Sequence, residues 1–183
     1  LEAVAELPSP LQQKIRLVFV GENDGGEYGA SITDRVRSLA GKVKVDITGF
    51  ADDALYRDYL EAADIAVQLR AISRGETSKA VYDCMAHGLP TIVNDYASFA
   101  ELPSQVVRKI EARPDAEVLS AAIASLVEDN EGRRLLGSYA YGYIRRQHDP
   151  DITARVYASA VEGARCRRSW ASGELVVKSI ADA

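Results

Sequence analysis

The sequence predicts an α/β domain in which a doubly wound parallel sheet is followed by C-terminal helices. Short apolar runs alternate with helical patterns through the first half of the chain, which is typical of parallel strands joined by crossover helices. These runs are almost continuously apolar or β-branched, as strands covered on both faces are. With 183 residues, of which 47% are hydrophobic and 27% charged, the chain can bury the core of one domain.

The strands are expected at residues 15–20, 43–48, 65–69 and 91–94. Helical patterns fall between successive strands, at residues 30–40, 54–63 and 78–87. The resulting order is βαβαβαβ, and parallel neighbours joined in this way have right-handed crossovers.

After Asn94 the alternation ends. A short apolar piece at residues 105–108 precedes helical patterns at 115–128, 132–147 and 151–165. We therefore expect one domain over residues 1–165 and a weakly patterned tail over 166–183, with Trp170 as its large apolar side chain. Residues 1–7 are typical of the end of a helix and no strand precedes them, so the chain is expected to begin within the domain.

Composition excludes several classes of protein. Lysine and arginine number 22 against 27 aspartate and glutamate, which gives a net charge of −5 and no basic footprint for nucleic acid. The sequence has neither an apolar run of about 18 residues nor a basic segment followed by an apolar one, so a cytoplasmic protein is expected. Cys84 and Cys166 lie far apart without companion ligands, which predicts neither a disulfide nor a metal site.

Two loops that follow predicted strands carry polar residues where open parallel sheets bind ligands. The first, residues 21–29, contains Glu22, Asp24 and Glu27 and does not match the G-x-G-x-x-G pattern. Because these acids would repel a pyrophosphate, a flexible connection from strand to helix is favoured over a ligand contact.

The second loop, residues 73–79, opens the predicted helix 78–87. Thr77 and Ser78 are good N-terminal caps, and the free backbone N–H groups with the helix dipole form an anion site. In helical spacing Glu76 and Asp83 share one face. Two interpretations of Asp83 remain open: a solvated ion pair with Lys79, or an acid that receives a ligand hydroxyl. The helix is expected to end at Gly88 in a left-handed conformation.

Three segments, 59–67, 74–78 and 83–94, together resemble the donor-binding half of family 4 (group 1) glycosyltransferases, and the similarity extends from Leu1 to about Glu162. The resemblance implies a Rossmann-like domain that is the C-terminal half of a two-domain GT-B fold. It further implies transfer of a hexose from a nucleoside diphosphate sugar with retention, without metal or other cofactor. The partner would be the N-terminal domain of the same protein, which supplies the acceptor site.

The resemblance also implies roles for individual residues. Asp83 aligns with the acid that binds the donor ribose. The acid that contacts the sugar would align with Gly75, one residue before Glu76, and we favour Glu76 there as the candidate catalytic residue. Thr77 and Ser78 would contact phosphate, and Glu101 would be a polar neighbour. The donor-binding residues expected in all are Arg74, Gly75, Glu76, Thr77, Ser78, Asp83 and Glu101.

One departure concerns the arginine and lysine of the family that neutralise the donor pyrophosphate. They precede the region in which this sequence begins, so the chain alone is expected not to turn over. Two alternatives stay open. One is a nucleotide-sugar epimerase of the same architecture, whose expected acid and histidine constellation is not found. The other is a non-catalytic nucleotide-binding or interaction module, to which the position of Glu76 and the acidic first loop give some weight.

The C-terminal region carries many arginines, which could meet an acidic lipid surface or a phosphorylated acceptor. Solvated helix charges are the favoured interpretation, and a lipid-linked acceptor at the inner face of the membrane is the second expectation. His148 is assigned no catalytic role, because Asp149 and Pro150 explain that segment as a helix start.

Overall fold

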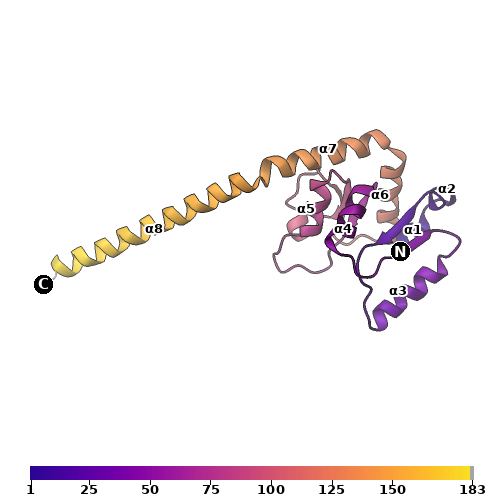
Figure 1. The fold of residues 1–183 in the computed structure, drawn as a ribbon, viewed down its shortest axis with the longest axis horizontal. Helices are drawn as coiled ribbons and strands as arrows, with labels where there is room; N and C mark the ends of the chain where they lie inside the picture. The colour runs from indigo at the N-terminus through magenta and orange to yellow at the C-terminus, as the bar shows by residue number, and fades with distance from the viewer. Residues whose placement is uncertain (182–183) are drawn as a thin grey trace. The chain divides into compact units, whose positions relative to one another are not determined.

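A computed structural model describes the backbone of residues 1–181 and the side chains of residues 1–166. The chain divides into two compact units, residues 1–144 and residues 145–183, which are described separately below. Figure 1 follows the chain from the indigo N-terminal helices to the yellow helix α8.

Unit 1 contains the predicted alternation. Its strands are β1 (Arg16–Phe19), β2 (Lys44–Ile47), β3 (Ala66–Gln68), β4 (Thr91–Asn94) and β5 (Arg108–Ile110). The helices that join the first four strands are α3 (Glu27–Ser38), α4 (Asp53–Ala62) and α5 (Lys79–Ala86). The order βαβαβαβ is therefore confirmed to within a few residues at each boundary.

The remaining helices flank this alternation. Two short ones, α1 (Glu2–Glu6) and α2 (Ser9–Gln12), precede β1, and the 3-10 helix η1 (Ala97–Phe99) lies between β4 and β5. The chain continues in α6 (Ala116–Glu128), α7 (Asn130–Gln147) and α8 (Pro150–Ala181). The apolar piece at 105–108 leads directly into β5, and its residues Val106 and Val107 are buried in the core.

All of the strand pairs are parallel. β1 pairs with β2, with Arg16 opposite Lys44, while β4 pairs with β3 on one side and β5 on the other. The pairs form two groups, β1–β2 and β3–β4–β5, instead of one continuous ladder. The α/β class is confirmed, and the division of the sheet is a feature that the sequence did not predict.

Helices cover both faces of β4. Its adjacent residues Ile92 and Val93 are fully buried and belong to different clusters, and consecutive strand residues point to opposite faces. Ile92 packs with Val4 of α1 and Ile123 of α6, whereas Val93 packs with Met85 of α5. Unit 1 is thus a layered α/β/α structure, as a doubly wound sheet requires.

The predicted helix boundaries follow from capping side chains. Asp115 accepts a hydrogen bond from the backbone N–H of Val118 at 2.9 Å, and Asp149 accepts one from Asp151 at 2.9 Å. Gly88 has a φ of +65°, which confirms the left-handed end of α5.

In unit 2, α8 continues to Ala181, beyond the predicted end at residue 165. The side chain of Trp170 lies outside the described side chains, so the docking of the tail stays a prediction. Within the described residues, none of the helices is both long enough and apolar enough to span a membrane.

Candidate functional site

Asn94, the last residue of β4, ties together the carboxyl ends of the strands. Its side chain is 1% exposed. Its Oδ1 accepts a hydrogen bond from the backbone N–H of Arg70 at 2.9 Å, and its Nδ2 donates to the carbonyl oxygens of Arg70 at 2.8 Å and Ala112 at 2.7 Å. One buried amide therefore fixes where the chain leaves β3 and where it leaves β5.

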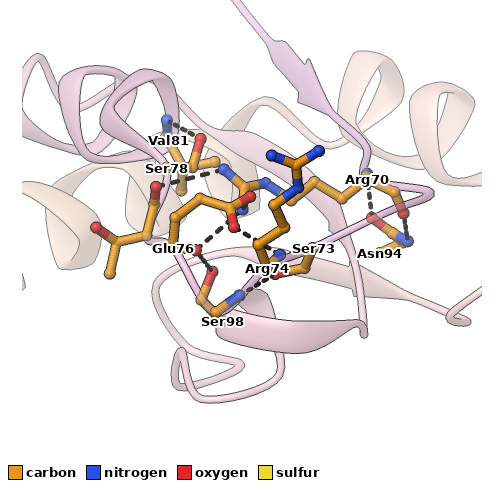
Figure 2. Close-up of polar contacts among 10 residues, drawn as sticks. Arg70, Ser73, Arg74, Glu76, Ser78, Val81, Asn94 and Ser98 are labelled. Atoms are coloured by element: carbon orange, nitrogen blue, oxygen red, sulfur yellow. Dashed lines mark hydrogen bonds and ion pairs between the residues drawn. The ribbon is translucent and has the colours of Figure 1, made fainter.

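Arg70, the second residue after β3, reaches from this fixed point into the loop 73–78. Its guanidinium donates to the Glu76 carboxylate at 2.6 Å and to the carbonyl oxygens of Glu76 at 3.0 Å and Thr77 at 3.3 Å. Its side chain is only 18% exposed, and its Cζ lies 5.1 Å from the centre of the Phe99 ring. Arg70 is thus a partly buried clamp on the loop (Figure 2).

Glu76 occupies the middle of the loop, as Figure 2 shows. Besides Arg70, its carboxylate accepts a hydrogen bond from the backbone N–H of Arg74 at 2.7 Å, and its carbonyl oxygen accepts one from the Ser98 hydroxyl at 3.1 Å. Hydrogen bonds from the backbone of Glu76 itself and of Arg74 lower the pKa of Glu76, and the charge of Arg70 adds to the effect. Glu76 therefore helps to shape the loop that presents it.

Gly75 gives the loop its turn. Its φ is +90°, a region that side-chain-bearing residues rarely adopt, whereas a Cβ atom at this position would meet nothing within 4 Å. The requirement for glycine is conformational, and does not come from crowding within the chain.

Helix α5 begins at Lys79, with Ser78 as its N-cap; the Ser78 hydroxyl accepts a long hydrogen bond of 3.5 Å from the backbone N–H of Val81. The predicted cap is confirmed. Glu76 precedes the helix, so the helical count that placed it on one face with Asp83 is wrong. Glu76 lies instead in the loop that leads into the N-terminus of α5.

Asp83 lies one turn into α5 and is 26% exposed. Its Oδ2 accepts hydrogen bonds from Lys79 Nζ at 2.6 Å and from the Tyr56 hydroxyl of α4 at 3.2 Å. Burial, and then the charge of Asp83, raise the pKa of Tyr56 to about 12, so the phenol stays a donor at neutral pH. The ion pair with Lys79 is present, and both described bonds go to the same carboxylate oxygen.

The predicted donor-binding residues lie on three different parts of the chain. Residues 74–78 share the loop, Asp83 lies on the helix that follows it, and Glu101 lies in the turn after η1. Burial raises the pKa of Tyr82, and the charges of Tyr143 and then Glu101 add to the effect. A contribution of Glu101 to the site stays a prediction.

The first loop connects β1 to α3, as predicted, and its flexibility stays a prediction. The Asp24 carboxylate accepts hydrogen bonds from the backbone N–H groups of Gly26 at 2.9 Å and Gly29 at 3.4 Å, at the start of α3. A carboxylate of the chain therefore occupies the position that an anion would take. The N-termini of α3 and α5 therefore differ. The carboxylate of Asp24 accepts hydrogen bonds at the start of α3, whereas the neutral side chain of Ser78 caps α5.

Cys84 is buried in the core and Cys166 is exposed. Burial raises the pKa of the Cys84 thiol to about 11, so it stays protonated inside the core. Among the described residues, no group of three or more His, Cys, Asp or Glu side chains is placed to hold a metal ion.

Sequence reasoning missed Arg70, Asn94, Ser98 and Tyr56 as parts of the site. Asn94 is a polar residue that ends an otherwise apolar buried strand, and this pattern is the one signal that could have identified it. The contacts of the others depend on which loops the fold places side by side.

Acidification should loosen the loop. Because its folded-state pKa is lowered, Glu76 contributes stability that is present above its unfolded pKa and is lost as pH falls through the lower folded value. We expect amide exchange in residues 73–78, corrected for intrinsic pH effects, to accelerate below about pH 4.5. Glu76→Gln should accelerate it already at pH 7. Equal loop protection in the variant and the parent at pH 7 would contradict this role.

The chain belongs to the glycosyl transferases group 1 family, whose model matches residues 1–143. A search of curated proteins returned no match.

Solved glycosyltransferase structures share its fold. Anabaena HepE in complex with UDP superimposes with a TM-score of 0.77 at 17% identity, over 88% of this chain and 43% of that chain. Sucrose-phosphate synthase from Thermosynechococcus elongatus superimposes with a TM-score of 0.69 at 21% identity, over 91% of this chain and 42% of that chain. This chain therefore spans less than half the length of these proteins.

A third similar structure is itself a single domain. The C-terminal domain of LpcC, a group 1 family protein from Francisella tularensis, gives a TM-score of 0.64 at 16% identity, over 81% of this chain and 77% of that one. The similarity to an isolated C-terminal domain supports the prediction that this chain is the C-terminal domain of a GT-B protein.

Proposed function

We propose that this chain is the donor-binding domain of a retaining glycosyltransferase that transfers a hexose from a nucleoside diphosphate sugar without a metal ion. The observation that carries the proposal is the loop 70–78, which is held in shape at the carboxyl end of β3 and opens directly onto the N-terminus of α5 in a chain of this family. The fold similarity to HepE, solved with UDP and with UDP-glucose, supports a nucleotide or nucleotide-sugar as the ligand.

The diphosphate is received at the start of α5. The first N–H groups of any α-helix have no partner within the helix, so those of Lys79 and Ala80 are directed toward an approaching anion. Thr77 and Ser78 add hydroxyl groups, and Arg74 adds a cation. As the bond to the sugar breaks, these donors stabilise the charge that grows on the leaving diphosphate.

The two acids have separate tasks in this proposal. Asp83 uses Oδ2 for Lys79 and Tyr56, so the donor ribose is received at Oδ1. Glu76, ionised because its pKa is lowered, accepts hydrogen bonds from the sugar hydroxyls and lies near the positive charge of an oxocarbenium-like transition state.

Turnover requires a second domain, which we propose is the N-terminal half of the same protein. It would supply the acceptor site and the cations for the pyrophosphate, so the 183-residue chain binds the donor but does not transfer sugar. A cytoplasmic location and a lipid-linked acceptor at the inner face of the membrane stay predictions from the sequence.

Calorimetric titration of the 183-residue chain with UDP, GDP and ADP tests the proposal. We expect saturable binding of at least one nucleotide. Asp83→Asn should weaken it by about tenfold or more, because a hydrogen bond to a charged group is worth about 1.5 to 3 kcal/mol. The matched control is Asp34→Asn, which removes an exposed acid paired with Arg37 on α3 and should leave the affinity unchanged.

Binding of none of the three nucleotides would contradict the donor site. Binding that Asp83→Asn leaves unchanged would contradict the ribose assignment alone.

A further inference from the structure

The two side chains that donate to the Asp83 carboxylate are held with very different firmness. Both described hydrogen bonds go to Oδ2, one from Lys79 Nζ at 2.6 Å and one from the Tyr56 hydroxyl at 3.2 Å. The Lys79 side chain is 84% exposed and lies one turn before Asp83 on the same helix. Exposed ion pairs of this kind gain little, because two flexible side chains must be held in one geometry. Lys79 is therefore a weak restraint on the orientation of Asp83, although its bond is the shorter one.

Tyr56 reaches Asp83 from a different helix, α4, and packing holds its ring. The ring packs against a buried cluster of Leu60, Cys84 and Leu89, which joins α4 to α5 and to the segment that follows α5. A tyrosine side chain has only two angles to fix, so a packed ring leaves its hydroxyl little freedom. Tyr56 is therefore the firm donor to Asp83.

The Tyr56 ring also contacts the competing donor, since Lys79 Nζ lies 5.5 Å from the ring centre. One anchored ring thus restrains both charges of the pair. We propose that Tyr56 is a positioning residue for nucleotide binding: its hydroxyl holds the Asp83 carboxylate by one oxygen, so that the other oxygen receives the ribose hydroxyls. This inference rests on the proposed function, and it assigns to Tyr56 the preference for a ribose over a sugar that lacks its 2′ and 3′ hydroxyls.

The size of the effect follows from the freedom that Asp83 would gain. Without the Tyr56 hydroxyl, the first side-chain angle of Asp83 can occupy other staggered positions. Apparent affinity falls in proportion to the population of the orientation that can bind. If that orientation is about one in three, the affinity for a ribonucleotide falls about threefold. A nucleotide without ribose hydroxyls does not use the bond to Asp83, so its affinity should not change.

Calorimetry of the 183-residue chain and of Tyr56→Phe tests the proposal. The ligands are the tightest binding of UDP, GDP and ADP, and the 2′,3′-dideoxy form of the same nucleotide. Phenylalanine keeps the ring that packs on the cluster, and removes only the hydroxyl. We expect the parent chain to prefer the ribonucleotide by about tenfold or more, and Tyr56→Phe to reduce this preference by about threefold or more. The affinity for the dideoxynucleotide should stay the same.

A second measurement needs no nucleotide. Three-bond NMR couplings to the carboxyl carbon of Asp83 report whether its first side-chain angle is fixed or averaged. We expect the values of a single orientation in the parent chain and in Lys79→Met, and averaged values in Tyr56→Phe. The matched control is Tyr59→Phe, which removes the hydroxyl of another half-buried tyrosine of α4. It should change neither the couplings of Asp83 nor the preference for the ribonucleotide.

Two results would overturn the role of Tyr56 while the donor site stands. One is nucleotide binding in which Tyr56→Phe keeps the full preference for the ribonucleotide, or loses affinity for both ligands equally. The other is averaging of the Asp83 couplings in Lys79→Met but not in Tyr56→Phe, which would assign the orientation to Lys79. A parent chain that binds none of the three ribonucleotides would overturn this inference together with the proposed function.

Discussion

Replacing Asn94 with leucine, a side chain of similar size, is expected to lower the free energy of unfolding by about 3 kcal/mol. The substitution removes one acceptor oxygen and two N–H donors. It leaves the N–H and carbonyl of Arg70 and the carbonyl of Ala112 without the bonds that they make at 2.7 to 2.9 Å. Each buried polar group deprived of its partner costs about 1 to 3 kcal/mol, and some of this cost is relieved by rearrangement of the loops. Urea unfolding followed by circular dichroism measures the effect.

Asn94→Asp tests the contribution of the hydrogen bonds apart from that of packing, because aspartate has nearly the same shape as asparagine but lacks its N–H donors. Its second oxygen would face the carbonyl oxygens of Arg70 and Ala112, so the carboxylate is expected to destabilise the fold at neutral pH at least as much as leucine. Protonation would restore a donor, so the difference from the parent protein should narrow as pH falls. Asn130→Ser, at an exposed position, serves as the control and should change stability by less than about 0.5 kcal/mol. If Asn94→Leu lowered the free energy of unfolding by no more than about 0.5 kcal/mol, the role of Asn94 would be contradicted.

Arg70→Met is expected to weaken nucleotide binding by about tenfold or more, because the loop 73–78 would then have to be ordered at the expense of binding energy. The loss of the bonds to Glu76 and Thr77 frees the segment that leads into α5, while the methionine can still pack near Phe99. Calorimetry gives the affinity, and amide exchange of the loop reports its order independently. Arg70→Lys should resemble Arg70→Met, since one ammonium group cannot reproduce the forked contacts of a guanidinium.

Arg37→Met is the matched control, because it removes an exposed arginine that pairs with Asp34 of the same helix. It should change neither nucleotide affinity nor loop exchange. Faster loop exchange in Arg70→Met with unchanged affinity would show that the loop is held by Arg70 but is not the donor site. Unchanged exchange would contradict the clamp itself.

Local patterns predicted most of the fold. Apolar strands, helix caps such as Asp115 and Ser78, and the glycine that ends α5 each act within a few residues, so they can be recognised along the chain. The division of the sheet could not be predicted in this way, because the number of neighbours that a parallel strand has depends on topology and not on its own residues. Phe19 and Val67 look like interior residues in sequence and are exposed in the structure.

The candidate site was predicted in part for a similar reason. Residues 74–78 were identified because strand, glycine turn and helix cap are consecutive in sequence. Arg70 and Ser98 hold the same loop from positions that the fold alone brings close to it. Glu76 shows where helical periodicity fails as a guide. Helical spacing relates Glu76 to Asp83 only if residue 76 is helical, but α5 begins at Lys79, and Gly75 and Arg70 set the conformation of the preceding loop.

The central claim is that the loop 70–78 and the start of α5 form the donor site. The measurement that tests it most directly is a titration of the ¹⁵N-labelled 183-residue chain with UDP, GDP and ADP, followed by NMR. The account predicts saturable shifts of the amide signals of residues 73–80 with at least one nucleotide, and no such shifts at the start of α3, where Asp24 occupies the anion position. Shifts centred on α3, or unchanged signals at residues 73–80 with all three nucleotides, would contradict it.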